Sequence, residues 1–169
     1  MEYYQDFLKN ENYIDLKIKG LHKDGGISHI ATHKIIMAAT FGEEFVKFVS
    51  KPTNYLPARK STLEAMVAFA YNFPVNVSNE NLSELLKFSS SYQDFAKIID
   101  DYLLKNITLN NALETFQLAH EGIPHERERL QTLQLIKAFI VKKCLPLNDI
   151  KGGFRNLPLP IMEEFVKDR

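Results

Sequence analysis

The chain has 169 residues and a formal net charge of zero, with 21 basic and 21 acidic side chains. This balance provides no general attraction for a phosphate backbone or an anionic bilayer, so we expect neither nucleic acid nor membrane as a partner. Cys144 is the only cysteine, which excludes an internal disulfide and favours a reducing intracellular compartment, either cytoplasmic or nuclear.

The first element that the sequence predicts is a β-hairpin. Ile14, Leu16 and Ile18 alternate with polar residues, which is the pattern of a strand with one buried face. Residues 23–26 are predicted to form the turn, because their two glycines tolerate positive φ. Residues 27–31 then form the returning strand.

After the hairpin the apolar spacing becomes helical. It predicts two short helices that are interrupted at residues 40–42, followed by a very short strand at residues 55–56. Ser61 and Glu64 have the spacing of a capping box, which predicts that a helix begins at Ser61.

The rest of the chain is predicted to be helical, apart from a loop marked at residues 146–160, and it contains no internal repeat. Apolar stripes predict helices over about residues 82–88, 92–104, 109–120, 124–143 and 161–167. The elements together predict an α+β fold, in which a small sheet of about three strands is wrapped by helices and followed by an all-helical segment.

No residue pattern of a catalytic or cofactor site is apparent. His29 and His33 straddle a strand-to-helix junction, and no cluster of acids or cysteines completes a metal site around them. His33 is better explained as a structural histidine whose ring bonds to backbone. Residues 89–91 lack the glycines of a nucleophile elbow, and residues 23–26 lack the ending of a phosphate-binding loop. We therefore expect no enzyme activity, no metal and no cofactor.

The order of the elements, together with five short motifs, resembles a BTB/POZ domain over about residues 6–104. The motifs lie at residues 13–18, 31–39, 41–45, 63–71 and 81–86. The remainder resembles the helical BACK extension of Kelch-type proteins, through Asn111-Ala112-Leu113 and residues 157–165. The resemblance implies a BTB/POZ-like domain at residues 1–104 and a BACK-like extension at residues 105–169, which we expect to be incomplete.

This resemblance implies a non-catalytic protein–protein interaction module. Members of the family self-associate as homodimers and act as adaptors, most often as the substrate-recruiting subunit of a cullin-RING ubiquitin ligase. One departure favours an alternative, because residues 50–57 are short and lack the hydrophobic–any–Glu tripeptide of relatives that dock on cullins. The alternative is a BTB scaffold of a transcriptional or cytoskeletal assembly that binds no cullin.

The resemblance also implies which residues contact protein partners. They are Tyr3, Tyr4, Phe7, Leu8, Asp15, His33, Lys34, Phe45, Phe48 and Val49. In relatives, a pair such as Asp15 and Lys34 lines a charged pocket near the dimer seam, whereas the plainer interpretation is an ordinary strand aspartate beside a solvated lysine. From a different class, the rival hypothesis is an enzyme whose site combines Asp15, His33 and Lys34.

Overall fold

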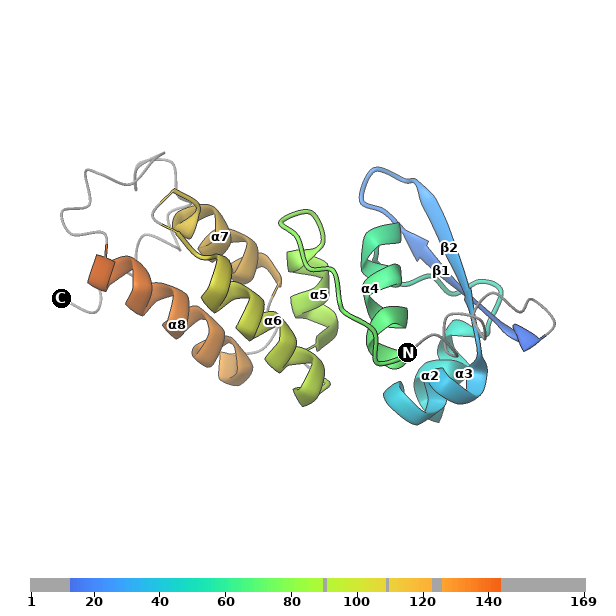
Figure 1. Cartoon of the computed structure of the whole chain (residues 1–169). Coiled ribbons are helices and arrows are strands. Elements are labelled where there is room, and N and C mark those ends of the chain that lie inside the picture. Colours follow the sequence, from blue (N-terminus) through green and yellow to red (C-terminus); the bar gives the residue numbers. More distant parts are fainter. Residues whose placement is uncertain (1–12, 90, 109, 123–125, 144–169) are drawn as a thin grey trace. The chain divides into compact units, whose positions relative to one another are not determined.

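Residue contacts divide the chain into two compact units, Met1–Asn76 (unit 1) and Val77–Arg169 (unit 2). The computed structural model describes residues 13–89, 91–108, 110–122 and 126–143 (Figure 1). The predicted α+β class is confirmed, with a small antiparallel sheet in unit 1 and helices in both units. The contacts group residues 77–104 with the helices that follow them, whereas the sequence assigned them to the first domain.

Unit 1 begins with the predicted hairpin. Strands β1 (Leu16–Leu21) and β2 (Ile27–Thr32) pair antiparallel, in a register that runs from Leu16 opposite Thr32 to Leu21 opposite Ile27. The alternating pattern buries Leu16 and Ile18 on the inner face, where helix α4 contacts the hairpin. Figure 1 shows α4 alongside the two strands.

The hairpin turn is built around Asp24 and two glycines, as predicted. Gly25 has a φ of 85°, a conformation that glycine adopts without steric cost. The Gly26 N–H donates to Asp24 Oδ1 at 3.0 Å, and this bond lowers the pKa of the Asp24 carboxyl below its usual range. The local chemistry of the turn thus fixes the register of the strands.

The predicted third strand is reduced to a single bridge, so within the described residues the sheet has two strands, where the sequence predicted about three. Leu56 forms an isolated parallel bridge to Gly20. Its carbonyl accepts from the Leu21 N–H at 2.8 Å, and its own N–H donates to the Lys19 carbonyl at 2.9 Å. Pro57 follows at once and has no N–H to donate, so a ladder cannot continue through it.

Three helices complete the described part of unit 1. They are α2 (Lys34–Phe41), α3 (Glu43–Val49) and α4 (Lys60–Ala70). The predicted interruption is confirmed at Gly42, whose φ of 88° separates α2 from α3. The fully buried side chains of α4 include Leu63 and Met66, which belong to the core of this unit.

The capping box predicted at Ser61 is wrong. Helix α4 begins one residue earlier, at Lys60, and Arg59 occupies the N-cap position. Ser61 therefore lies inside the first turn, while Glu64 pairs with Lys60 across one helical turn at 3.7 Å. The Ser-x-x-Glu spacing matches both a cap and a helix interior, and only the position of Arg59 decides between them.

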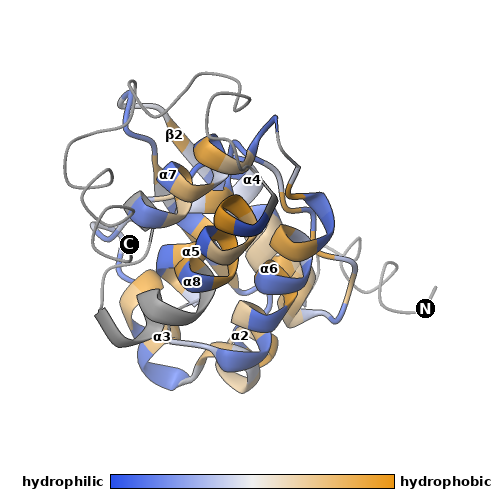
Figure 2. Ribbon diagram, turned by 90° about the vertical axis from the view of Figure 1, so that its left-hand side faces the viewer, coloured by the Kyte–Doolittle hydropathy of each residue, from blue (hydrophilic) through white to orange (hydrophobic). Residues whose placement is uncertain are grey.

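The described part of unit 2 consists of two successive helix pairs. The helices are α5 (Leu82–Ser89), α6 (Gln93–Asn106), α7 (Ala112–Gly122) and α8 (Glu126–Lys143). Helix α5 packs on α6 and α7, and α8 packs on α7 and α6. Figure 2 shows apolar and hydrophilic residues alternating along α6, as the amphipathic stripes predicted. The core side chains include Leu82, Leu85, Phe95, Ile99, Leu103, Phe116, Ile136 and Ile140.

A short structural repeat precedes the first helix of each pair, although the sequence indicated no repeat. Asn81 Oδ1 accepts from the Ser78 N–H at 2.8 Å, and Asn111 Oδ1 accepts from the Thr108 N–H at 2.7 Å. In both places the fourth residue of the motif turns its side chain back to the first and closes a hydrogen-bonded loop ahead of the helix. Each helix pair of unit 2 therefore starts from the same local device.

Candidate functional site

Asp15 and Lys34 lie close to each other, as the resemblance predicted. The contact between them joins the Asp15 side chain to the Lys34 backbone. Asp15 Oδ1 accepts from the backbone N–H of Lys34 at 2.7 Å, at the start of α2. An acidic side chain at a helix N-terminus satisfies an otherwise unpaired amide and interacts favourably with the helix dipole. The bond uses the backbone of Lys34 and not its side-chain amine. Lys34 is an exposed residue beside the aspartate.

His33 is buried and belongs to the interior of unit 1. Its Nδ1 is hydrogen-bonded to the Tyr71 hydroxyl, and the Thr32 hydroxyl lies 3.3 Å from the same Tyr71 oxygen. This bond of the His33 ring goes to a side chain at the end of α4, whereas the sequence predicted a bond to backbone. Because His33 faces the core and Asp15 faces the surface, the structure does not bring Asp15, His33 and Lys34 together as one set of side chains.

We expect Tyr71→Phe to lower the free energy of unfolding by about 1–3 kcal/mol. The substitution removes the buried hydroxyl to which both His33 and Thr32 are hydrogen-bonded. Urea denaturation followed by far-UV circular dichroism measures this change. Tyr55→Phe is the matched control, since Tyr55 is exposed. Equal unfolding midpoints for the two variants would contradict a structural role for the Tyr71 hydroxyl.

The three aromatic and aliphatic residues predicted on α3 differ in exposure. Phe45 is partly buried and packs against Phe41, with ring centroids 5.2 Å apart and the rings tilted by 56°. Val49 is buried and Phe48 is exposed. His33 and Val49 are thus largely covered within unit 1, whereas Phe48 is exposed, and the role of these residues as partner contacts stays a prediction.

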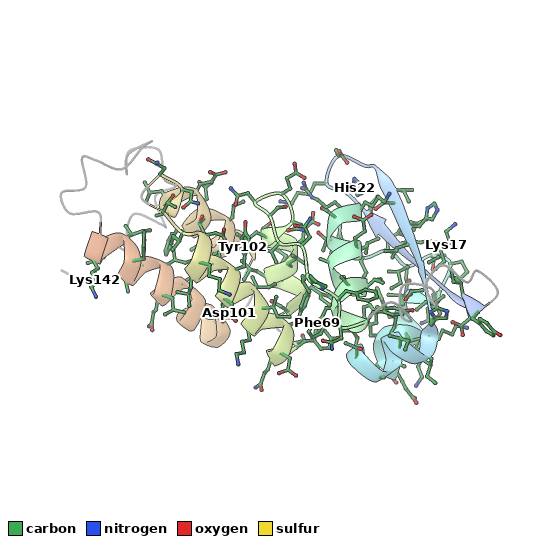
Figure 3. The ribbon with its side chains drawn as sticks, viewed as in Figure 1. Lys17, His22, Phe69, Asp101, Tyr102 and Lys142 are labelled. Carbon is green, nitrogen blue, oxygen red and sulfur yellow. The ribbon has the colours of Figure 1, made fainter. Side chains whose placement is uncertain are left out.

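A shallow groove of about 210 Å³ runs beside the Asp15–Lys34 contact. Buried Leu16 and Val49 contribute to its lining, together with Pro52 from the loop after α3. Four lysines and one aspartate also line it, namely Lys17, Lys19, Lys34, Lys51 and Asp15. The groove thus combines apolar side chains with a marked excess of positive charge. Figure 3 labels Lys17 on β1 and shows its side chain projecting from the hairpin.

One of these lysines is fixed by its neighbours. The Lys19 amine donates to the Pro52 carbonyl at 2.7 Å and lies 5.5 Å from the centroid of the Tyr55 ring. The carbonyl bond and the ring attract the same cation, which ties the loop after α3 to strand β1. Lys19 consequently shapes one end of the groove.

Unit 1 also carries large apolar side chains on its surface. Leu21 and Ile27 are directly opposite each other in the hairpin and both are exposed. Ile35 on α2 is 76% exposed and Phe48 on α3 is 46% exposed. Helices α2 and α3 contact each other, so these two side chains belong to one packed pair of helices.

Several predicted features fall outside the described residues. They are Tyr3, Tyr4, Phe7, Leu8, Cys144 and the helix predicted at residues 161–167. Within residues 13–89, 91–108, 110–122 and 126–143, no group of three histidine, cysteine or acidic residues is placed to hold a metal ion. In the same ranges, no helix is both long and apolar enough to span a bilayer.

Sequence reasoning missed Tyr71 as the partner of His33, and it missed the lysine groove. A buried histidine predicts a nearby polar partner, but nothing in the spacing of the two residues identifies it. The lysines come from β1, α2 and the loop after α3, so their clustering follows from the fold alone. In comparisons with known proteins, no family model and no curated protein sequence matches this chain.

Proposed function

We propose that the chain is a non-catalytic protein-interaction module of the BTB/POZ type, which self-associates and acts as an adaptor. The observation that carries the proposal is the exposure of Ile35 and Phe48 on the packed helices α2 and α3. Large apolar side chains that remain exposed on neighbouring helices favour a place where another polypeptide docks. The order of hairpin, short helix pair and longer helix in unit 1 is consistent with this family.

Self-association is tested by sedimentation equilibrium over a range of protein concentrations. The parent chain is expected to form dimers, and Ile35→Asp or Phe48→Asp is expected to shift the average mass toward the monomer without loss of helical circular dichroism, because a buried unpaired carboxylate opposes association. Asn79→Asp adds the same charge at an exposed polar position and is expected to leave the mass unchanged. A parent that stays monomeric at every concentration contradicts self-association.

The chain has two candidate roles as an adaptor. The first is the substrate-recruiting subunit of a cullin ubiquitin ligase, and the second is a scaffold that organises a transcriptional or cytoskeletal assembly without a cullin. The segment between α3 and α4 favours it. Residues 50–57 contain no glutamate, and Leu56 joins β1 by backbone hydrogen bonds near the end of this short segment. A pull-down with a cullin amino-terminal domain separates the two adaptor roles, since binding supports a ligase subunit and no binding supports the scaffold.

A further inference from the structure

The groove lined by Lys17, Lys19, Lys34 and Lys51, called the lysine groove, has an excess of positive charge that the chain as a whole does not have. The whole chain is neutral, yet four of the charged residues that line the groove are lysines and one is an aspartate. The aspartate carboxylate already accepts a hydrogen bond from the Lys34 backbone, which positions Lys34 at the rim. An excess of one sign at a concave surface raises the local concentration of ligands of the opposite sign.

Three of the four lysine amines are available to a ligand. Lys19 is held by the Pro52 carbonyl and the Tyr55 ring. Lys17, Lys34 and Lys51 are exposed and take part in none of the ion pairs formed within the described part of unit 1. They come from β1, from the start of α2 and from the loop after α3, so three separate elements each contribute a lysine to the lining of one groove.

The groove is also apolar in part, which distinguishes it from a purely electrostatic patch. Leu16 and Val49 are buried residues that nevertheless contribute to its lining, and Pro52 adds a further apolar surface. A ligand that fits both features carries carboxylates around an apolar side chain. Apolar contact supplies affinity in such a site, while the charges select the partner and orient it.

We infer that the groove binds an acidic segment of a partner protein, in which glutamate or aspartate side chains flank an apolar residue. The carboxylates contact the amines of Lys17, Lys34 and Lys51, and the apolar residue lies against Pro52, which is the exposed apolar residue of the groove. Each exposed charge pair is weak by itself, so recognition requires the three cations together. This inference rests on the proposed interaction function and specifies the chemistry of one partner.

The test is a fluorescence-anisotropy titration of the full chain with a labelled peptide of sequence Glu-Glu-Leu-Glu-Glu. Saturable binding that weakens on addition of sodium chloride is expected, and the peptide Gln-Gln-Leu-Gln-Gln is expected to bind at least about tenfold more weakly. The double variant Lys17→Glu/Lys51→Glu is expected to lose about tenfold or more in affinity. The matched control Lys23→Glu/Lys105→Glu makes the same change in net charge at exposed positions outside the groove.

Equal affinities for the groove variant and the control variant overturn the inference, as does binding of the two peptides with equal affinity. Inorganic pyrophosphate is the second probe. If it binds and competes while the glutamate peptide does not bind, the groove recognises phosphate and the acidic-peptide inference is wrong. Sedimentation of the same variants separates the two proposals, because a chain that dimerises but does not bind the peptide contradicts the groove alone.

Discussion

Replacement of Gly20 by valine is expected to lower the free energy of unfolding of unit 1 by about 3 kcal/mol or more. A Cβ atom at Gly20 would lie 2.1 Å from the Ala58 carbonyl oxygen and 3.2 Å from a Leu63 methyl carbon. The nearest atom is backbone, so no side-chain rotation relieves the clash. The segment at residues 56–58 must move away from β1, and the bridge between Leu56 and Gly20 is then lost.

Urea denaturation and amide hydrogen exchange at Leu21 and Leu56 measure this effect, since the Leu21 N–H bonds to the Leu56 carbonyl. Gly25→Asn is the control. Gly25 has positive φ but nothing lies within 4 Å of an added Cβ, and asparagine tolerates this conformation. We expect the control to lose less than about 1 kcal/mol. Unchanged exchange at Leu21 in Gly20→Val would contradict the close approach.

The second large effect is expected on α6, where two adjacent leucines have opposite environments. Leu103 is 3% exposed and Leu104 is 54% exposed. Leu103→Ala is expected to cost about 2–5 kcal/mol, because it removes buried methyl groups and leaves a cavity between packed helices. Leu104→Ala removes the same atoms from the same helix at the surface and is expected to change stability by less than about 0.5 kcal/mol.

The comparison of these two variants cancels the change in helix propensity, which is the same at neighbouring interior positions of one helix. Urea midpoints from circular dichroism give the difference, with hydrogen exchange along α6 as a second measurement. If the two variants unfold at the same midpoint, the orientation of α6 described above is wrong.

The parts of the fold that follow from local patterns could be predicted from the sequence. The alternation of Leu16 and Ile18 with polar residues predicted β1, because the period of two decides which face of a strand is buried. The interruption of the helical apolar pattern near Gly42 predicted that α2 and α3 are separate helices. In both cases, the residues that decide the structure are adjacent in the chain.

Features that depend on distant residues could not be predicted in the same way. Leu56 is a residue type that strands accept, and the absence of a side chain at Gly20 allows the segment to approach β1 closely. The pairing is limited to one bridge because Pro57 follows. The division of the chain after Asn76 follows from the packing of α5 on α7, which no sequence pattern reveals. Domain limits are set by contacts between elements rather than by the elements themselves.

The candidate site shows the same division. The proximity of Asp15 and Lys34 came from the family resemblance and agrees with the geometry, although the bond uses a backbone amide. The hydroxyl of Tyr71, which lies 38 residues from its partner His33 in sequence, could not be assigned. The total charge of zero concealed the lysine groove, because composition records how many charges a chain has and not where the fold gathers them.

The paired loops at Asn81 and Asn111 have a consequence for how unit 2 folds. Each helix pair carries its own start signal within four residues, and each pair contacts the next one along the chain. Contacts between neighbours in sequence are closed at low entropic cost, so ordering is expected to nucleate in either pair and spread to the other within milliseconds. We expect unit 1 to fold more slowly than unit 2, because its bridge joins Gly20 to Leu56, which is distant in the sequence.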